Sequence, residues 1–130
     1  MMKTAIAAAL LAGLGLAGHA AAGPSYGKPF HACMERAGGV TQAMIECIGE
    51  ELDRQDARLN RVYRERLSEL VPARRALLQS VQRQWLRYRD ANCGFYYDPD
   101  GGSIARVLAA DCRLRMTAER ADELDALGQR

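Results

Sequence analysis

Apolar residues recur at steps of three and four along most of the chain, which is the period of an amphipathic α-helix. A short helix is predicted over residues 30–36, and the sequence AGG at residues 37–39 breaks it. A long helix is predicted from Thr41, whose hydroxyl is placed to cap the first turn, to about Leu70. Its apolar stripe consists of Met44, Ile45, Ile48, Leu52, Leu59, Val62, Tyr63, Leu67 and Leu70.

Two further helices are predicted after Leu70. Pro72 opens the first of them, because a first turn does not need the N–H that proline lacks, and its apolar stripe continues to Cys93. A turn-rich segment, YYDPDGGS at residues 96–103, leads into the last helix, which Ser103 is expected to cap. No alternating strand pattern of useful length is present. The predicted fold is therefore all-α: a short N-terminal helix, a long helical hairpin and a C-terminal helix in an up-down-up arrangement.

A hairpin about Val71 places residues of its two helices at matching levels. Asp56 then lies level with Trp85, and Leu59 lies level with Gln82. The inward side of the second helix carries Gln82, Trp85 and Arg89. Its outward side carries Arg83, Arg87 and Asp90. The single tryptophan is therefore assigned to the interior and not to a binding surface.

Polar residues on the facing sides of this hairpin are predicted to form a buried network. A buried carboxylate needs a partner, and arginines stand at the right levels to supply one to Asp56. The predicted network contains Asp56, Asn60, Tyr63, Gln82, Trp85, Arg89 and Arg120. The alternative role for Asp56, a general acid or base, lacks an accompanying nucleophile or metal ligand.

Residues 1–22 have the layout of a secretory signal peptide, with a short positive start, an apolar run and small residues that allow cleavage after Ala20 or Ala22. The run is too short and glycine-rich for a membrane span, which needs about 20 apolar residues. The nearest cysteine, Cys33, lies too far away to carry a lipid anchor. We therefore expect a soluble protein exported to the periplasm or the medium, with a flexible lead at residues 23–29 and a domain at residues 30–128.

Charge and histidine content limit the possible functions. Of 18 basic residues, Lys3 leaves with the signal peptide, so 17 remain against 16 acidic residues. This near-balance argues against nucleic-acid binding. His31 is the only histidine after cleavage, and no Ser-His-Asp set, Cys-His pair or phosphate-binding loop can be assembled. The sequence therefore predicts neither an enzyme nor a bound cofactor.

Four cysteines in an exported chain predict two disulfides, for which three pairings are possible. A zinc site is disfavoured because no Cys-x-x-Cys spacing occurs. The sequence DPDGGS does not fit a calcium-binding loop either. Such a loop needs glutamate at its twelfth position, where Ala109 stands when Asp98 is the first.

The turn-rich segment is the best candidate for a partner-binding surface. Its tyrosines offer rigid contact area with a polar tip, and its aspartates add local negative charge. The candidate binding residues are Tyr96, Tyr97, Asp98, Asp100, Gly102 and Ser103. An equally open interpretation is a simple helix connector, in which the glycines only allow Ser103 to cap.

Five segments occur in an order that resembles the LprI-like lysozyme-inhibitor family of small exported bacterial proteins. They are CMERAGGVTQAMIEC (33–47), DARLNRVYRERL (56–67), QRQWLRYRDANC (82–93), GGS (101–103) and CRLRMTAERADEL (112–124). The resemblance implies a small helical domain with one local early and one local late disulfide, which favours Cys33–Cys47 and Cys93–Cys112. The helix register leaves a Cys47–Cys93 bridge open as well.

The same resemblance implies an exported, disulfide-stabilised module that binds a protein partner. Lysozyme is the partner that the family name suggests, and an inhibitor would block the cleft that holds the enzyme's two carboxylates. The alternative is a periplasmic scaffold or envelope-stress protein that binds an endogenous partner and has no lysozyme target.

Overall fold

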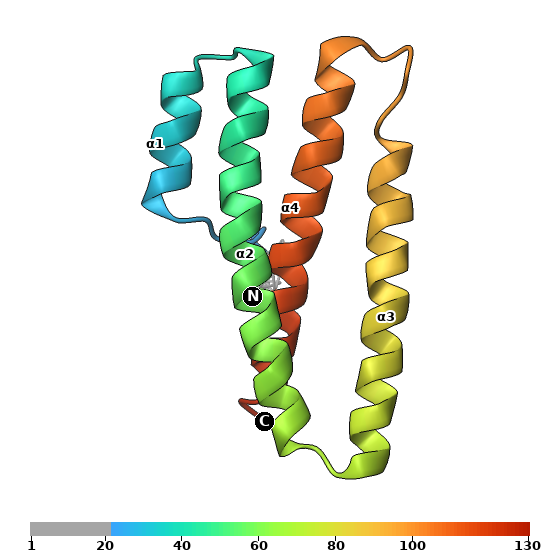
Figure 1. Cartoon of the computed structure of the whole chain (residues 1–130). Helices are drawn as coiled ribbons and strands as arrows, with labels where there is room; N and C mark the ends of the chain where they lie inside the picture. Colours follow the sequence, from blue (N-terminus) through green and yellow to red (C-terminus); the bar gives the residue numbers. More distant parts are fainter. Residues whose placement is uncertain (1–21) are drawn as a thin grey trace, which may run out of the picture.

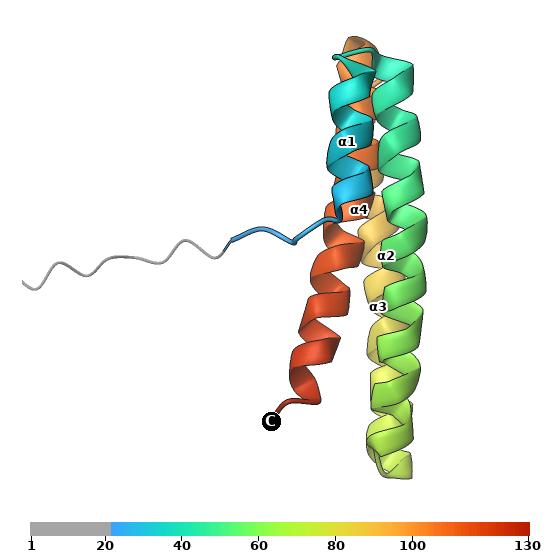
Figure 2. The same cartoon turned by 90° about the vertical axis from the view of Figure 1, so that its left-hand side faces the viewer.

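The computed structural model describes residues 22–130, so the predicted signal peptide lies outside the described residues apart from Ala22. These residues form four helices and no strand: α1 (Lys28–Ala37), α2 (Thr41–Glu69), α3 (Pro72–Phe95) and α4 (Gly102–Leu127). Successive helices run antiparallel, and α1 and α3 lie on opposite sides of the α2–α4 pair (Figure 1, Figure 2). The predicted all-α fold is confirmed.

Glycine and proline set several helix boundaries. α1 ends at Ala37. Its C-cap residue Gly38 has a left-handed φ of 55°, and Gly39 follows with a φ of 82°. Glycine adopts this conformation without the steric cost that a Cβ brings. Pro72 stands in the first turn of α3, where the sequence places it.

Two predicted helix caps are wrong. The N-cap residues of α2 and α4 are Val40 and Gly101, and neither makes a side-chain cap hydrogen bond. Thr41 and Ser103 already lie inside the first turns of these helices. A capping side chain has to come from the extended residue before the helix, so both hydroxyls stand too late in the sequence.

The α2–α4 pair forms the centre of the domain, because α2 packs most extensively against α4. Toward the α1 end, the buried core consists of Phe30, Ile48, Val107 and Leu114. Toward the other end, it consists of Leu59, Val62, Ala121 and Leu124. Ala118 and Ala121 are fully buried, and side chains of this size let the two helices approach closely.

α3 leans on α4 and touches α2 only sparsely. Leu78 and Trp85 pack at the edge of the core cluster that contains Leu59 and Leu124. Only Gln82 and Cys93 of α3 are buried. The predicted hairpin is present, but its two helices do not form the core with each other. Much of the α3 surface consequently remains exposed.

The segment before α1 is anchored to the domain at Tyr26. The Tyr26 ring packs against the core beside Phe30, with ring centroids 5.0 Å apart. α1 begins at Lys28, slightly earlier than predicted, and the Cys33–Cys47 disulfide ties it to α2. The lead expected to be flexible therefore contains one residue that belongs to the core.

Candidate functional site

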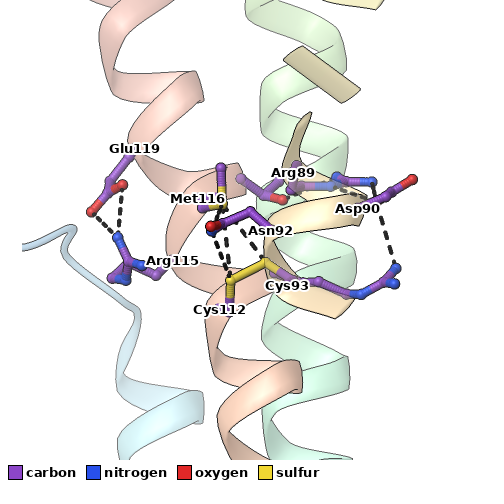
Figure 3. The surroundings of a disulfide bond; sticks show 10 residues. Arg89, Asp90, Asn92, Cys93, Cys112, Arg115, Met116 and Glu119 are labelled. Atoms are coloured by element: carbon purple, nitrogen blue, oxygen red, sulfur yellow. Dashed lines mark hydrogen bonds and ion pairs between the residues drawn. A yellow bond between two sulfur atoms is a disulfide. The ribbon is translucent and has the colours of Figure 1, made fainter. Parts of the chain in front are cut away.

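The candidate site is the connection between α3 and α4, and a disulfide braces it. Cys93 in the last turns of α3 is bonded to Cys112 of α4, and both residues are buried. The Met116 sulfur packs against this bridge, and the Asn92 amide donates hydrogen bonds to the sulfurs of Met116 (3.3 Å) and Cys112 (3.6 Å) (Figure 3). The structure thus contains the two local cysteine pairs that the resemblance implies, which rules out a Cys47–Cys93 bridge.

Residues 96–103, called here the tyrosine loop, project beyond this brace. Tyr96 and Tyr97 are 41% and 55% exposed, and the neighbouring Phe95 is 84% exposed. Asp98, Asp100, Gly102 and Ser103 are exposed as well. All six predicted binding residues are therefore exposed to solvent.

Backbone hydrogen bonds hold the tyrosine loop in a defined shape. The Tyr97 N–H donates to the Gly94 carbonyl (3.1 Å), and the Gly101 N–H donates to the Asp98 carbonyl (3.0 Å). The Asp98 carboxylate accepts from the Asp100 N–H at 2.9 Å. A Cβ at Gly101 would stand 2.9 Å from the Ala105 Cβ, so glycine is required for this tight return. A loop ordered in this way loses little conformational entropy when it binds.

The tyrosine loop is also locally negative. No lysine or arginine occurs between Asp90 and Arg106, whereas Asp98 and Asp100 both lie in this interval. Their charges therefore dominate the tip of a chain that is close to neutral as a whole. Exposed charge at short range favours a cationic surface on a partner.

Behind the loop, two arginines flank the half-buried Trp85. The guanidinium carbons of Arg89 and Arg120 lie 5.3 Å and 5.9 Å from its ring centroid, within the range of cation–π contacts. Arg120 Nε donates to the Gln82 amide oxygen at 3.1 Å, and Arg89 Nη1 donates to the Thr117 hydroxyl at 3.2 Å. This part of the predicted network joins α3 to α4.

The predicted buried ion pair of Asp56 is wrong. Asp56 is only partly buried, and its carboxylate accepts a 3.4 Å hydrogen bond from Asn60 on the same helix. Arg120 pairs instead with Glu123 (2.6 Å), and Arg89 pairs with Asp90 (3.1 Å). Because α3 leans on α4, the space between α2 and α3 stays open. It forms a groove of about 300 Å³ lined by Asp56, Leu59, Asn60, Tyr63, Gln79, Gln82, Arg83 and Leu86.

A second buried polar group was not predicted from the sequence. Glu51 is 2% exposed, accepts hydrogen bonds from Gln55 (2.9 Å) and Arg54 (2.7 Å), and lies on the core side of α2. Burial by itself raises the pKa of the Glu51 carboxyl, but these bonds and one from the Gly27 backbone hold that pKa below its ordinary value of 4.5. The spacing from Ile48 to Glu51 and Gln55 continues the apolar stripe, and this signal could have identified both residues.

Comparison with known proteins identifies the family. The family model described as "Lysozyme inhibitor LprI" matches residues 33–124. The chain belongs to this family. The matched region of this LprI-family chain includes both disulfides and the whole tyrosine loop. An "Uncharacterized protein R02472" of Rhizobium meliloti (strain 1021) is 28% identical over 95 residues, which cover 62% of this chain and 68% of the relative. No solved structure matches the chain.

Two further observations concern the cellular environment of this LprI-family chain. Its disulfides indicate an oxidising compartment. Within residues 22–130, no helix is long and apolar enough to cross a membrane.

Proposed function

We propose that this chain is an exported protein-binding module that inhibits a lysozyme by inserting the tyrosine loop into the substrate cleft. The observation that carries the proposal is the combination of exposed Tyr96 and Tyr97 with two carboxylates on a loop braced by the Cys93–Cys112 disulfide. Membership of a family described as lysozyme inhibitors supports the choice of partner. The signal-like sequence at residues 1–22 supports export.

The chemistry of the loop suits such a cleft in two ways. A lysozyme cleft holds two carboxyl groups, and the tyrosine hydroxyls can donate hydrogen bonds to them. Lysozymes of animals are typically basic, so Asp98 and Asp100 can contact cationic residues at the rim of the cleft. Because the chain is nearly neutral overall, attraction acts through these local charges and not through long-range steering.

Blocking a cleft requires a rigid insert, and the fold supplies one. The loop begins directly after the last turn of α3, and Cys93 fixes that turn to α4. The Tyr97 N–H is bonded to the Gly94 carbonyl, and the hydrogen bonds that Asp98 accepts define the turn that follows the two tyrosines. The inhibitor acts by occupancy, and none of its own residues has to take part in a chemical step.

The proposal is tested by a cell-wall hydrolysis assay with excess purified, oxidised protein. Inhibition is expected from the wild type, and Tyr97→Ser should weaken it at least about tenfold, as expected for an aromatic contact at the centre of an interface. Tyr88→Ser is the matched control, because Tyr88 is an exposed tyrosine on α3 outside the loop. Undiminished hydrolysis with animal and bacterial lysozymes, together with capture of an envelope protein, would favour the scaffold alternative instead.

A further inference from the structure

The groove between α2 and α3 carries polar side chains on both of its walls. α2 supplies a carboxylate, an amide and a phenol, and α3 supplies two amides and a guanidinium. Leu59 and Leu86 add apolar contact. A volume of about 300 Å³ stands at the lower end of the range for small-molecule sites, which typically combine a concave surface with a few polar groups. The groove therefore has the size and the lining of a site for a small polar molecule.

Two opposite charges of this groove have no counter-ion. Asp56 on α2 and Arg83 on α3 form no ion pair within residues 22–130. No cation lies three or four positions from Asp56, and no anion lies at these positions from Arg83, so neither helix supplies a partner. The hydrogen bond that Asp56 accepts from Asn60 is long at 3.4 Å, and a carboxylate can accept about four. Both charges are thus available to a ligand.

Gln82 adds a donor that has no acceptor in the described part of the chain. Its side chain is 6% exposed, and its amide oxygen accepts a hydrogen bond from Arg120 Nε at 3.1 Å. Among the described side chains, only nitrogens of Arg66 are fully covered without a partner. The Gln82 amide nitrogen therefore reaches a surface, and the surface that Gln82 lines is this groove. A buried N–H group normally has an acceptor, and a molecule in the groove can supply one.

We propose that this groove binds a small zwitterion, a molecule with one ammonium and one carboxylate group such as a free amino acid or a short peptide. The ammonium contacts Asp56, and the carboxylate contacts Arg83 and the amide N–H of Gln82. Hydrogen bonds between ionised partners are about twice as strong as neutral ones. The amides of Asn60 and Gln79 can both donate and accept, which suits a peptide group in the same ligand.

Other classes of small ligand fit this lining less well. Residues 22–130 contain no group of three His, Cys, Asp or Glu side chains that could hold a metal ion. An anion such as phosphate would face the Asp56 carboxylate, which like-charge repulsion disfavours. A neutral sugar gains no ion pair from either charge. The ring of Tyr63 packs against the core cluster of Leu59 and Leu124, so it offers no free face for a sugar to stack on.

Nuclear magnetic resonance titration of the isotope-labelled, oxidised protein tests the proposal, with alanine and dialanine as probes. Saturable shifts of the Gln82 side-chain amide signals are expected. N-acetyl-dialanine lacks the ammonium and dialanine amide lacks the carboxylate, so each should bind at least about tenfold more weakly than dialanine. The tighter of the two probes shows whether the amino acid or the peptide is the better ligand.

Substitution of the two charged residues separates their roles. Asp56→Asn should weaken dialanine binding at least about tenfold and abolish the preference for the free over the acetylated peptide. Arg83→Gln should weaken it similarly and abolish the preference for the carboxylate over the amide. Asp53→Asn and Arg87→Gln are the matched controls, because both residues are exposed on the same helices but lie outside the groove. These variants should bind dialanine as the wild type does.

Three results would overturn the proposal. They are no saturable shift with either probe up to about 10 mM, equal binding of free and blocked dialanine, and equal losses in the control variants. Tighter binding of N-acetylglucosamine oligomers than of dialanine would assign the groove to sugars and overturn it as well. The tyrosine loop begins ten residues after Leu86, about 15 Å along the helix direction. Lysozyme inhibition is therefore tested independently of this groove.

Discussion

Gly128 lies directly over the guanidinium of Arg66, so a methyl group at position 128 would overlap Arg66 Nη1. The Arg66 side chain is almost covered, pairs with Glu69 at 3.0 Å, and lies beside the C-terminal end of α4. A cation is favourable there because the last carbonyls of a helix carry partial negative charge. The tail of the chain thus closes over a buried charge at the far end from the tyrosine loop.

Gly128→Ala should therefore destabilise the domain only modestly, by about 0.5–1 kcal/mol, because the flexible end of the Arg66 side chain has to move away from the added methyl group. Gly49→Ala is a control with the opposite sign. A Cβ at Gly49 meets nothing within 4 Å, and alanine stabilises a helix interior by about 0.5–1 kcal/mol relative to glycine. Chemical denaturation measures both effects, and equal stability of the Gly128→Ala variant would contradict the packing described here.

The Cys93–Cys112 disulfide should serve both stability and inhibition. Replacing both cysteines by alanine should lower the free energy of unfolding by about 3 kcal/mol and release the tyrosine loop, so lysozyme inhibition should fall. The matched control removes Cys33 and Cys47, whose bridge closes a loop of similar length at α1. That variant should lose similar stability but keep its inhibition, measured at a temperature where both variants are folded. Equal inhibition by the two variants would show that the Cys93–Cys112 disulfide is not needed to hold the tyrosine loop for inhibition.

Acid should weaken the fold through Glu51. The pKa of its carboxyl is held below the ordinary value of 4.5, so its contribution to stability is complete above pH 4.5 and is lost as the pH falls through the lowered pKa. Glu51→Gln should be less stable than the wild type at neutral pH, and this gap should narrow in acid. Denaturation at a series of pH values measures it. Glu50→Gln, at an exposed neighbouring position, is the matched control for the loss of one carboxylate.

High pH should destabilise the fold by ionising the Tyr26 hydroxyl. Burial, reinforced by the nearby carboxylates of Asp111 and Glu119, raises the pKa of Tyr26 to about 12. Because this pKa is raised, the contribution of the protonated Tyr26 hydroxyl to the stability of the fold is complete below pH 10 and is lost as the pH rises toward 12. Ultraviolet titration of the folded protein should show one late-ionising tyrosine that Tyr26→Phe removes. A titration curve unchanged by that substitution would contradict the anchoring of this residue.

Helix number, helix order and most helix boundaries could be predicted from the period of apolar residues and the positions of glycine and proline. The same period could not show which helices pack against each other through their apolar stripes. Leu59 and Val62 suit a partner on either side, and it is the small, fully buried Ala118 and Ala121 that bring α4 against α2. Once α4 occupies that face, α3 has to lean on the other side of α4.

This arrangement explains the error at Asp56 and the omission of Glu51. Asp56 faces the open space between α2 and α3, whereas Glu51 faces the core and finds its partners within its own helix. Spacing assigns a residue to a helix face, but the exposure of that face depends on packing between helices. The tyrosine loop could be recognised from its residue types alone, because tyrosine, proline and glycine are typical of projecting turns.

Calorimetric titration of lysozyme with the oxidised protein at physiological salt tests the proposed function most directly. We predict saturable binding of one lysozyme per chain, weakened at least about tenfold when Tyr97→Ser is combined with Asp98→Asn. This pair of changes removes an aromatic contact and a charge but leaves an oxygen at position 98 to hold the turn. Tyr88→Ser should bind as the wild type does. Absence of binding to every lysozyme tested, or full binding by the loop variant, would contradict the proposal.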